Sequence, residues 1–268
     1  MRSKKLLILY AFLLIVAVTT MIQLWRFNQR PQEIGPRDYP EIKEEGILRM
    51  ITEYNQSGYF VSGDTVQGFQ YELSQAIAKL SGLEVQTHLE MSLAKSFEEL
   101  SDNKCDVIAR NIPITSEMRE NGFSTSKSWY NVRQRRTTDK APIRNQLDLA
   151  QKTLYIPKDS PALLRLQNLG HEIGDTIYVV EDELYSTEQL MIMVAKGDID
   201  YAVCGQQIAR MTQKNLPEVD ILTDVSFTQL QSWAVRKDSP VLLDSLNSWL
   251  QQIKNSGLYD QIYKRYYK

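Results

Sequence analysis

The stretch Gly68-Phe-Gln-Tyr-Glu-Leu-Ser-Gln-Ala-Ile-Ala-Lys79 decides the fold of this chain. Apolar residues recur here at the spacing of one helix face. They are Phe69, Leu73, Ile77 and, just beyond the stretch, Leu80. Gly82 follows where a helix commonly ends in the left-handed conformation. The pattern therefore predicts an amphipathic helix that begins at Phe69 and stops at Gly82.

Short apolar segments flank this helix on both sides. Residues 47–52 and 85–89 have the pattern of strands, residues 93–100 fit a short helix, and residues 106–109 fit a buried strand. Strands that alternate with helices imply a mostly parallel sheet with right-handed crossovers. Ligands of such sheets bind beyond the carboxyl ends of the strands, so we expect a binding site there.

The second half of the chain repeats this order. The predicted elements are strands at 153–156, 177–180 and 201–204 and helices at 160–169 and 188–195. In each half a residue that tolerates the left-handed conformation, Asn103 or Gly197, separates a helix from the next strand. The repeat predicts two similar α/β lobes. A strand at 234–235 and a helix from 240 to about 256, stopped by Gly257, precede a tyrosine-rich basic tail.

The N-terminus is a candidate membrane segment. Arg2, Lys4 and Lys5 precede an uncharged, mostly apolar run at residues 6–25. This run reaches the ~20 residues that a helix needs to cross a bilayer, and the early positive charges favour a cytoplasmic N-terminus. A cleaved signal peptide is the alternative, although residues 17–20 make a poor cleavage site. Residues 26–40 have the composition of a linker.

The composition argues against several classes of function. The formal net charge is -2, so the basic surface of a nucleic-acid-binding protein is not expected. The two histidines, His88 and His171, are far apart and lack cysteine neighbours, so we expect neither a metal site nor a cofactor. The two cysteines, Cys105 and Cys204, could pair in an oxidising compartment or could be small buried apolar residues.

A series of short motifs resembles one known family. The motifs are Glu45-Gly-Ile-Leu-Arg49, Gly68-Phe-Gln-Tyr-Glu-Leu-Ser-Gln-Ala-Ile-Ala-Lys79, Cys105-Asp-Val-Ile-Ala109, Ile114-Thr-Ser-Glu117, Phe123-Ser124, Gly197-Asp-Ile-Asp200, Val235-Arg-Lys-Asp-Ser239 and Gly257-Leu-Tyr-Asp-Gln-Ile-Tyr-Lys-Arg-Tyr-Tyr267. Their order and spacing resemble those of the bacterial extracellular solute-binding proteins of family 3, the amino-acid-binding type, over residues 41–268. Residues 68–83 look most like the binding domain of membrane-bound lytic murein transglycosylase F.

This resemblance implies a two-lobed, periplasmic-binding-protein-like (type II) α/β fold. Lobe 1 is expected at residues 41–130 plus 229–268 and lobe 2 at residues 131–228, with hinges near 130–133 and 227–231. The two cysteines then lie in opposite lobes, which favours the buried, unpaired interpretation. Residues 1–25 would be a signal anchor or signal peptide, followed by the linker at 26–40. The implied location is the periplasm, with residues 6–25 anchoring the chain to the inner membrane.

Ligand-binding candidates come from both expected lobes. The resemblance places a stacking aromatic at Tyr54, ahead of Gly68 and Phe69, because a ring offers apolar area and a face that attracts cations. Tyr54 and Phe69 are both candidate ligand-binding residues. In the second half, Ser160 opens a predicted helix, where free backbone N–H groups could receive an anionic group of the ligand. Helix capping alone explains Ser160 equally well.

A ligand carboxylate calls for an arginine. The family places one three residues after the threonine that matches Thr115, but Met118 occupies that position here. Two alternatives remain open. Arg119 is adjacent to the expected position, and Arg110 lies at the carboxyl end of a predicted strand. Thr115 and Asn111, which follows Arg110, are ligand-binding candidates as well.

The largest departure from the family is Gly205. At this position the amino-acid binders carry the aspartate that pairs with the ligand ammonium, and glycine cannot form that pair. Because a buried ammonium needs a counter-charge, the departure argues against a free α-amino acid and favours a peptide or cell-wall fragment.

Three functions remain to be compared. The first is an extracytoplasmic binding protein that closes on an amino acid derivative, peptide or cell-wall fragment for transport or sensing, with an ABC transporter permease or another membrane protein as partner. The second is a murein-cleaving enzyme, but the sequence stops after its predicted terminal helix, so no catalytic domain is expected. The third is an enzyme built on the binding fold, yet Glu53 and Glu72 lack a nucleophile–base pair. We therefore expect a binding protein without enzymatic activity.

Overall fold

The computed structural model describes residues 14, 16–21, 37–113, 122–128, 130–135, 142–226 and 229–267. The chain forms two compact units, Met1–Gly35 and Pro36–Lys268. In the first unit, residues 16–21 are helical and exposed. No helix within the described residues is long and apolar enough to cross a membrane. Most of residues 6–25 lie outside the described ranges, so the membrane or signal segment stays a prediction.

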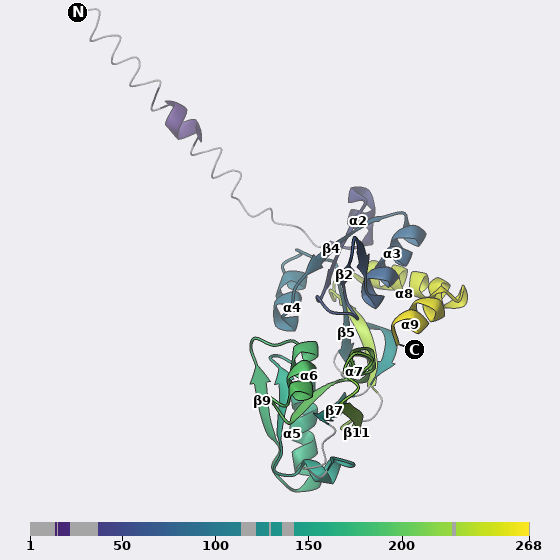
Figure 1. The fold of residues 1–268 in the computed structure, drawn as a ribbon. Coiled ribbons are helices and arrows are strands. Elements are labelled where there is room, and N and C mark those ends of the chain that lie inside the picture. Colours follow the sequence, from purple (N-terminus) through teal and green to yellow (C-terminus); the bar gives the residue numbers. More distant parts are fainter. Residues whose placement is uncertain are drawn as a thin grey trace, which may run out of the picture. The chain divides into compact units, whose positions relative to one another are not determined.

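Residues from both ends of the second unit build its first sheet, which has the strand order β4-β1-β5-β12-β6 (Figure 1). The strands are β1 (Ile47–Thr52), β4 (Glu84–Leu89), β5 (Val107–Pro113), β6 (Gly122–Ser128) and β12 (Gln229–Val235). Strand β1 pairs in parallel with β4 and β5, whereas β12 is antiparallel to β5 and β6. The predicted parallel pairing of the first three strands is confirmed.

The second sheet has the strand order β11-β7-β10-β8-β9. Its strands are β7 (Tyr130–Arg135), β8 (Thr153–Pro157), β9 (Tyr178–Asp182), β10 (Tyr201–Gly205) and β11 (Val219–Asp224). Strand β8 is parallel to β9 and β10, and β7 is antiparallel to β10 and β11. The chain passes from the first sheet to the second between β6 and β7 and returns between β11 and β12. The lobe boundaries stated above stay a prediction.

Helix α3 (Phe69–Ser81) matches the stretch that decided the fold. Its C-cap, Gly82, has a φ of 74°, as the left-handed end requires. Phe69, Leu73 and Ile77 are completely buried in the core of the first sheet. Leu80 is 45% exposed, so its predicted place on the buried face was wrong. Leu80 lies in the last turn of α3, where its neighbours Lys79 and Gly82 are exposed as well.

The tyrosine-rich tail forms helix α9 (Leu258–Tyr267), which follows α8 (Pro240–Asn255). It packs on α3, with the ring centroids of Phe69 and Tyr267 5.0 Å apart, and Figure 1 shows α3, α8 and α9 gathered beside the first sheet. Helices α4 (Leu93–Ser101), α5 (Ala162–Ile173) and α6 (Thr187–Lys196) match predicted segments. Elements without a sequence prediction are α2 (Tyr39–Glu45), β2 (Phe60–Ser62), β3 (Thr65–Gln67), η1 (Gln146–Leu149), α7 (Gln206–Gln213), β6, β7 and β11.

The repeated helix–stop–strand step is confirmed in both halves. Asn103, after α4, has a φ of 58°, and Gly197, after α6, has a φ of 84°. Both residues therefore adopt the left-handed conformation that the sequence pattern predicted. The strands that follow, β5 and β10, both lie in the middle of their respective sheets.

A buried ionic cluster ties the start of the second unit to the first sheet. Asp106 is completely buried and accepts hydrogen bonds from Arg37 Nε at 2.8 Å and from the Arg49 backbone N–H at 2.9 Å. Arg236, which follows β12, approaches the same carboxylate at 3.4 Å. The cluster thus joins three segments that are distant in sequence.

The two cysteines are buried and are not joined by a disulfide, as expected. Cys204 lies in β10 of the second sheet, whereas Cys105 precedes β5 of the first. Burial raises the pKa of the Cys105 thiol to about 12. Because both thiols are buried away from the reagent, we expect them to resist Ellman's reagent in the folded protein and to react fully in denaturant. Rapid modification without denaturant would contradict this prediction.

Candidate functional site

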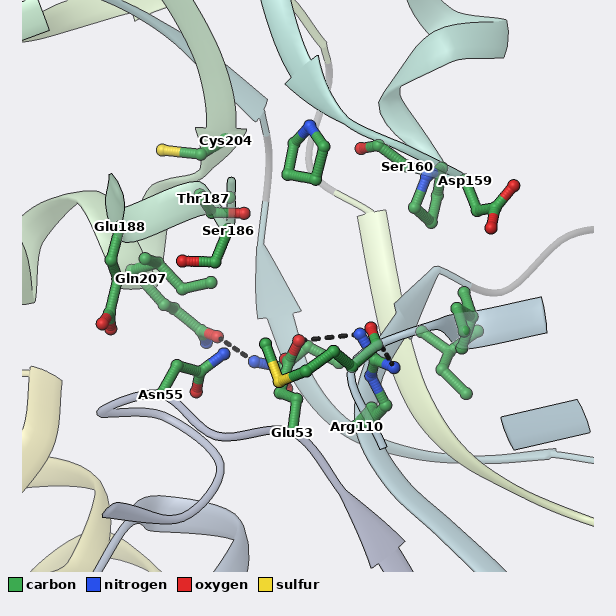
Figure 2. A pocket seen from close by; sticks show the side chains of 18 of the residues that line it. Glu53, Asn55, Arg110, Asp159, Ser160, Ser186, Thr187, Glu188, Cys204 and Gln207 are labelled. Carbon is green, nitrogen blue, oxygen red and sulfur yellow. Dashed lines mark hydrogen bonds and ion pairs between the residues drawn. The ribbon is translucent and has the colours of Figure 1, made fainter. Parts of the chain in front are cut away.

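A cavity of about 140 Å³ lies at the carboxyl ends of the parallel strands of both sheets, where the strand order predicted a ligand site (Figure 2). Its charged side chains are Glu53, Arg110, Lys158, Asp159 and Glu188. Its uncharged polar and small residues include Asn55, Asn111, Ser160, Ser186, Thr187, Cys204, Gly205, Gln207 and Gln231. Met91, Leu93, Ile112, Pro157, Pro161, Val203 and Ile208 supply apolar surface.

An ion pair forms the wall contributed by the first sheet. Arg110 Nη2, on β5, lies 2.7 Å from Glu53 Oε2, immediately after β1, and both side chains are at least four-fifths buried. Arg110 Nη1 also approaches the backbone carbonyls of Glu90 and Met91, at 3.4 and 3.2 Å. The charge of Arg110 is therefore matched by Glu53, and a ligand carboxylate would have to share this arginine with it.

Asn111 connects the two sides of the cavity. Its amide oxygen accepts from Gln70 Nε2 at 2.8 Å, and its Nδ2 donates to Ser57 Oγ and to Gln207 Oε1, each at 3.3 Å. Gln207 belongs to α7, next to the second sheet. Ser57 Oγ in turn shares a 2.6 Å hydrogen bond with the hydroxyl of Tyr267. A continuous set of polar contacts thus runs from the cavity to the end of α9.

Two helix starts form the wall contributed by the second sheet. Helix α5 begins at Ala162, two residues later than predicted, and Ser160 Oγ accepts from the Ala162 backbone N–H at 3.3 Å. Helix α6 begins at Thr187, with Ser186 as its N-cap and Gln189 completing a capping box. The N-cap of α5 is Pro161, without a side-chain cap hydrogen bond, so the expected capping role of Ser160 was wrong. Ser160, Ser186 and Thr187 line the cavity.

Glu188, in the first turn of α6, lies at the edge of the cavity that it helps to line (Figure 2). Its Oε1 accepts a hydrogen bond from the Gln56 backbone N–H at 3.0 Å. Burial raises the pKa of the Glu188 carboxyl above its usual value, and the negative charge of Glu53 raises it further, while the Gln56 hydrogen bond lowers it. Among the described residues, no basic side chain forms an ion pair with Glu188.

The structure brings three of the ligand-binding candidates to the cavity: Arg110, Asn111 and Ser160. Tyr54 is 52% exposed and does not line the cavity, although its neighbours Glu53 and Asn55 do. Phe69 is completely buried in the core against α9, so the structure corrects its assignment to the ligand surface. The ring packs in the core because Phe69 lies on the buried face of α3. Thr115 and Arg119 lie outside the described residues.

Sequence reasoning missed Asn55, Glu188 and Gln207. The capping pattern Ser186-Thr-Glu-Gln189 after a predicted strand was the available signal for Glu188, because it marks a helix that begins at a carboxyl end of the sheet. Glu72, considered earlier as a cleft carboxylate, instead pairs with Arg265 at 2.5 Å. No group of three or more metal-ligating side chains lies together within the described ranges.

Comparisons with known proteins agree with this architecture. The family model described as "Bacterial extracellular solute-binding proteins, family 3" matches residues 48–268. A membrane-bound lytic murein transglycosylase F from Desulfosudis oleivorans is 31% identical over 85% of this chain and 50% of its own length. One from Cronobacter sakazakii is 25% identical over 98% of this chain and 51% of its own length. The chain therefore spans about half the length of these relatives.

Solved structures share the fold. A mutant of the ArgBP protein from T. maritima has a TM-score of 0.70 and 24% identity, covering 85% of this chain and 97% of its own. The amino acid ABC transporter substrate-binding protein AbpA from Streptococcus pneumoniae, bound to L-arginine, has a TM-score of 0.71 and 20% identity. The match covers 85% of this chain and 98% of AbpA. An ancestral amino-acid-binding protein, a precursor of cyclohexadienyl dehydratase, also has a TM-score of 0.71, at 21% identity. The match covers 85% of this chain and 99% of the ancestral protein. With its cavity at the strand ends of two α/β sheets and a family match from residue 48 to 268, the chain belongs to the bacterial extracellular solute-binding proteins, family 3, and has the two-lobed fold of periplasmic binding proteins.

Proposed function

We propose that this protein captures a small ligand in the cavity next to Arg110 and Ser160, outside the cytoplasm, for transport or sensing. The observation that carries the proposal is that the cavity takes its walls from the strand ends of both sheets. Two hydrogen bonds bridge these walls, one from Asn111 to Gln207 and one from Gln56 to Glu188. Opening the cavity would break both bonds, and a ligand in contact with both walls would favour closure.

The size of the cavity supports a ligand about as large as an amino acid. Its volume of about 140 Å³ is below the roughly 300–1,000 Å³ of pockets for drug-sized molecules. A peptide or cell-wall fragment would therefore require a more open form. The relatives named for L-arginine or for amino acids support an amino acid derivative as the ligand class.

The location and partners follow from the same proposal. We place the binding unit in the periplasm, anchored to the inner membrane by residues 6–25, where an ABC transporter permease or another membrane protein would respond to its closure. The murein transglycosylase F relatives supply an alternative, in which this chain corresponds to their binding part and has no cleavage activity of its own.

An enzyme built on the binding fold is the second candidate. One observation favours it: Glu188 combines burial, a raised pKa and a position in the cavity, the properties of a general acid. The relation of one structural neighbour to a dehydratase is consistent with this possibility. We nevertheless favour binding. A second acid of the cavity, Glu53, is held in an ion pair with Arg110 and is therefore not available as a general base.

Ligand-induced stabilisation tests the proposed function. The full chain, purified in mild detergent, would be heated with cationic and neutral amino acids, short peptides and muropeptides while its tryptophan fluorescence is followed. A ligand at a hundred times its Kd adds ~2.7 kcal/mol of stability, or about 5–10 °C for a protein of this size. Failure of every compound to raise the Tm would contradict the proposal. Conversion of a bound compound to product, detected by mass spectrometry, would favour the enzyme.

A further inference from the structure

The cavity carries one negative charge that the described residues do not neutralise. Glu53 and Arg110 compensate each other, and Lys158 pairs with Glu183 at 2.7 Å outside the cavity. Asp159 is exposed to solvent. Glu188 is more deeply placed, and its one described hydrogen bond, from the Gln56 backbone N–H, reaches only Oε1. The described contacts therefore leave Oε2 of Glu188 available to a ligand.

The surroundings of Glu188 suit a positive group. Gln207 and Asn55 line the same cavity. Their amide oxygens accept from Asn111 Nδ2 and from the Gly58 backbone N–H. The amide groups are uncharged, so they supply no positive charge that would compete with a cation for Glu188. Figure 2 shows these three side chains around one part of the pocket, with the Glu53–Arg110 pair in another. Among these three side chains, only the carboxylate of Glu188 is charged and is purely a hydrogen-bond acceptor, so it is the group that suits a donor-rich cation.

Burial gives this carboxylate a reason to bind a cation. A carboxylate removed from water without a counter-charge is destabilised, and the first turn of α6 compensates only in part through its exposed N–H dipoles. A cation that enters the cavity would relieve this unfavourable burial. An anionic head group would instead meet Glu188 and Glu53 together.

We propose that Glu188 receives the positive group of the ligand, so that the cavity selects small molecules with a primary ammonium or guanidinium group. This inference rests on the proposed binding function and names the ligand chemistry of the same cavity. Glu188 thereby supplies a charge that Gly205, which also lines the cavity, does not.

The test compares Glu188→Gln with the unchanged protein by titration calorimetry. Glutamine keeps the size of the side chain and an oxygen that can accept from Gln56, but it removes the charge. Probes are paired by charge: L-arginine with L-citrulline, L-lysine with its Nε-acetyl form, and an α-amino acid with its Nα-acetyl form. The pairs separate a guanidinium, a side-chain ammonium and an α-ammonium as the recognised group.

We expect at least one cationic probe to bind at least tenfold more tightly than its neutral partner, and Glu188→Gln to remove this preference. The matched control is Glu172→Gln, an exposed acid outside the cavity whose partner Arg165 does not line it either, and it should leave the affinity unchanged. Binding of a neutral probe as tightly as its cationic partner, or an undiminished preference in Glu188→Gln, would overturn the inference while leaving the binding function intact. Absence of binding by any probe would overturn both.

The pH dependence gives an independent readout. Protonation of Glu188 removes the charge, so cation affinity should fall as the pH is lowered through its raised pKa, whereas the control variant keeps the same profile as the unchanged protein. Glu53, Arg110, Asp159 and Lys158 also line the cavity, so the profile is compared with that of Glu188→Gln, which should be flatter.

Stability without ligand excludes misfolding as the cause of lost binding. Because folding raises the pKa of Glu188, its contribution to stability is present at low pH and is lost as the pH rises through that pKa. Glu188→Gln should therefore melt at or above the temperature of the unchanged protein at pH 7.5, with a smaller difference at pH 4.5. A variant that melts earlier at both pH values would show that Glu188 serves the fold and not the ligand.

Discussion

Replacing Asp106 with asparagine is expected to lower the free energy of unfolding by about 3–5 kcal/mol, a large part of the ~5–15 kcal/mol available to a typical domain. The carboxylate is completely buried and accepts from Arg37 and from the Arg49 backbone. Arg37 and Arg236 are each more than nine-tenths buried. Removing the negative charge leaves two buried guanidinium groups without their shared counter-ion, which is more costly than losing one exposed ion pair.

Urea denaturation of the full chain measures this effect. The matched control is Asp102→Asn, four residues earlier, whose carboxylate pairs with Lys104 at 2.9 Å in solvent. An exposed pair of this kind contributes at most about 1 kcal/mol. Similar losses of stability in the two variants would show that burial does not set the strength of the Asp106 cluster.

Replacing Gly68 with alanine is expected to lower the free energy of unfolding by about 2–5 kcal/mol and to weaken ligand binding. Gly68 has a φ of 137°, which side chains rarely tolerate. An added Cβ would lie 2.2 Å from the backbone oxygen of Gly58. The backbone at Gly58 cannot retreat freely, because its carbonyl accepts from the Tyr71 N–H of α3 at 3.1 Å.

The expected loss of binding follows from the loop that Gly58 belongs to. Residues 53–58 include Glu53 and Asn55 of the cavity wall and Gln56, the backbone partner of Glu188. Gly82→Ala is the matched control, because Gly82 also has a positive φ, 74°, but an added Cβ there meets no atom within 4 Å. It should cost only about 1 kcal/mol and leave ligand affinity unchanged. Equal loss of binding in the two variants would contradict the role of the Gly58 contact.

The order of the elements and several of their ends could be predicted because they depend on near neighbours. The spacing of Phe69, Leu73 and Ile77 predicted α3, and Gly82, Asn103 and Gly197 adopt the left-handed conformation expected after a helix. Alternation of strands and helices predicted parallel strands, and parallel strands predicted the edge at which the cavity lies. Arg110, Asn111 and Ser160 reach the cavity for the same reason, although their role in binding stays a prediction.

Glycine at position 205 led to the expectation that the cleft lacks a partner for an ammonium group. Glu188, the acid that we propose for this role, could not be found from that position, because it lies on α6 and only the parallel pairing of β8 with both β9 and β10 brings the two strand ends to one edge.

By itself, the sequence determined the helices and strands whose apolar periodicity and caps are local, and hence the α/β class of this protein. Only the tertiary structure decided which of their side chains share a space. It placed Phe69 in the core against Tyr267, it matched Arg110 with Glu53, and it left Glu188 facing the cavity without a basic partner among the described residues. The physical reason is that these particular contacts join residues more than fifty positions apart, whereas helix and strand patterns depend on residues a few positions apart.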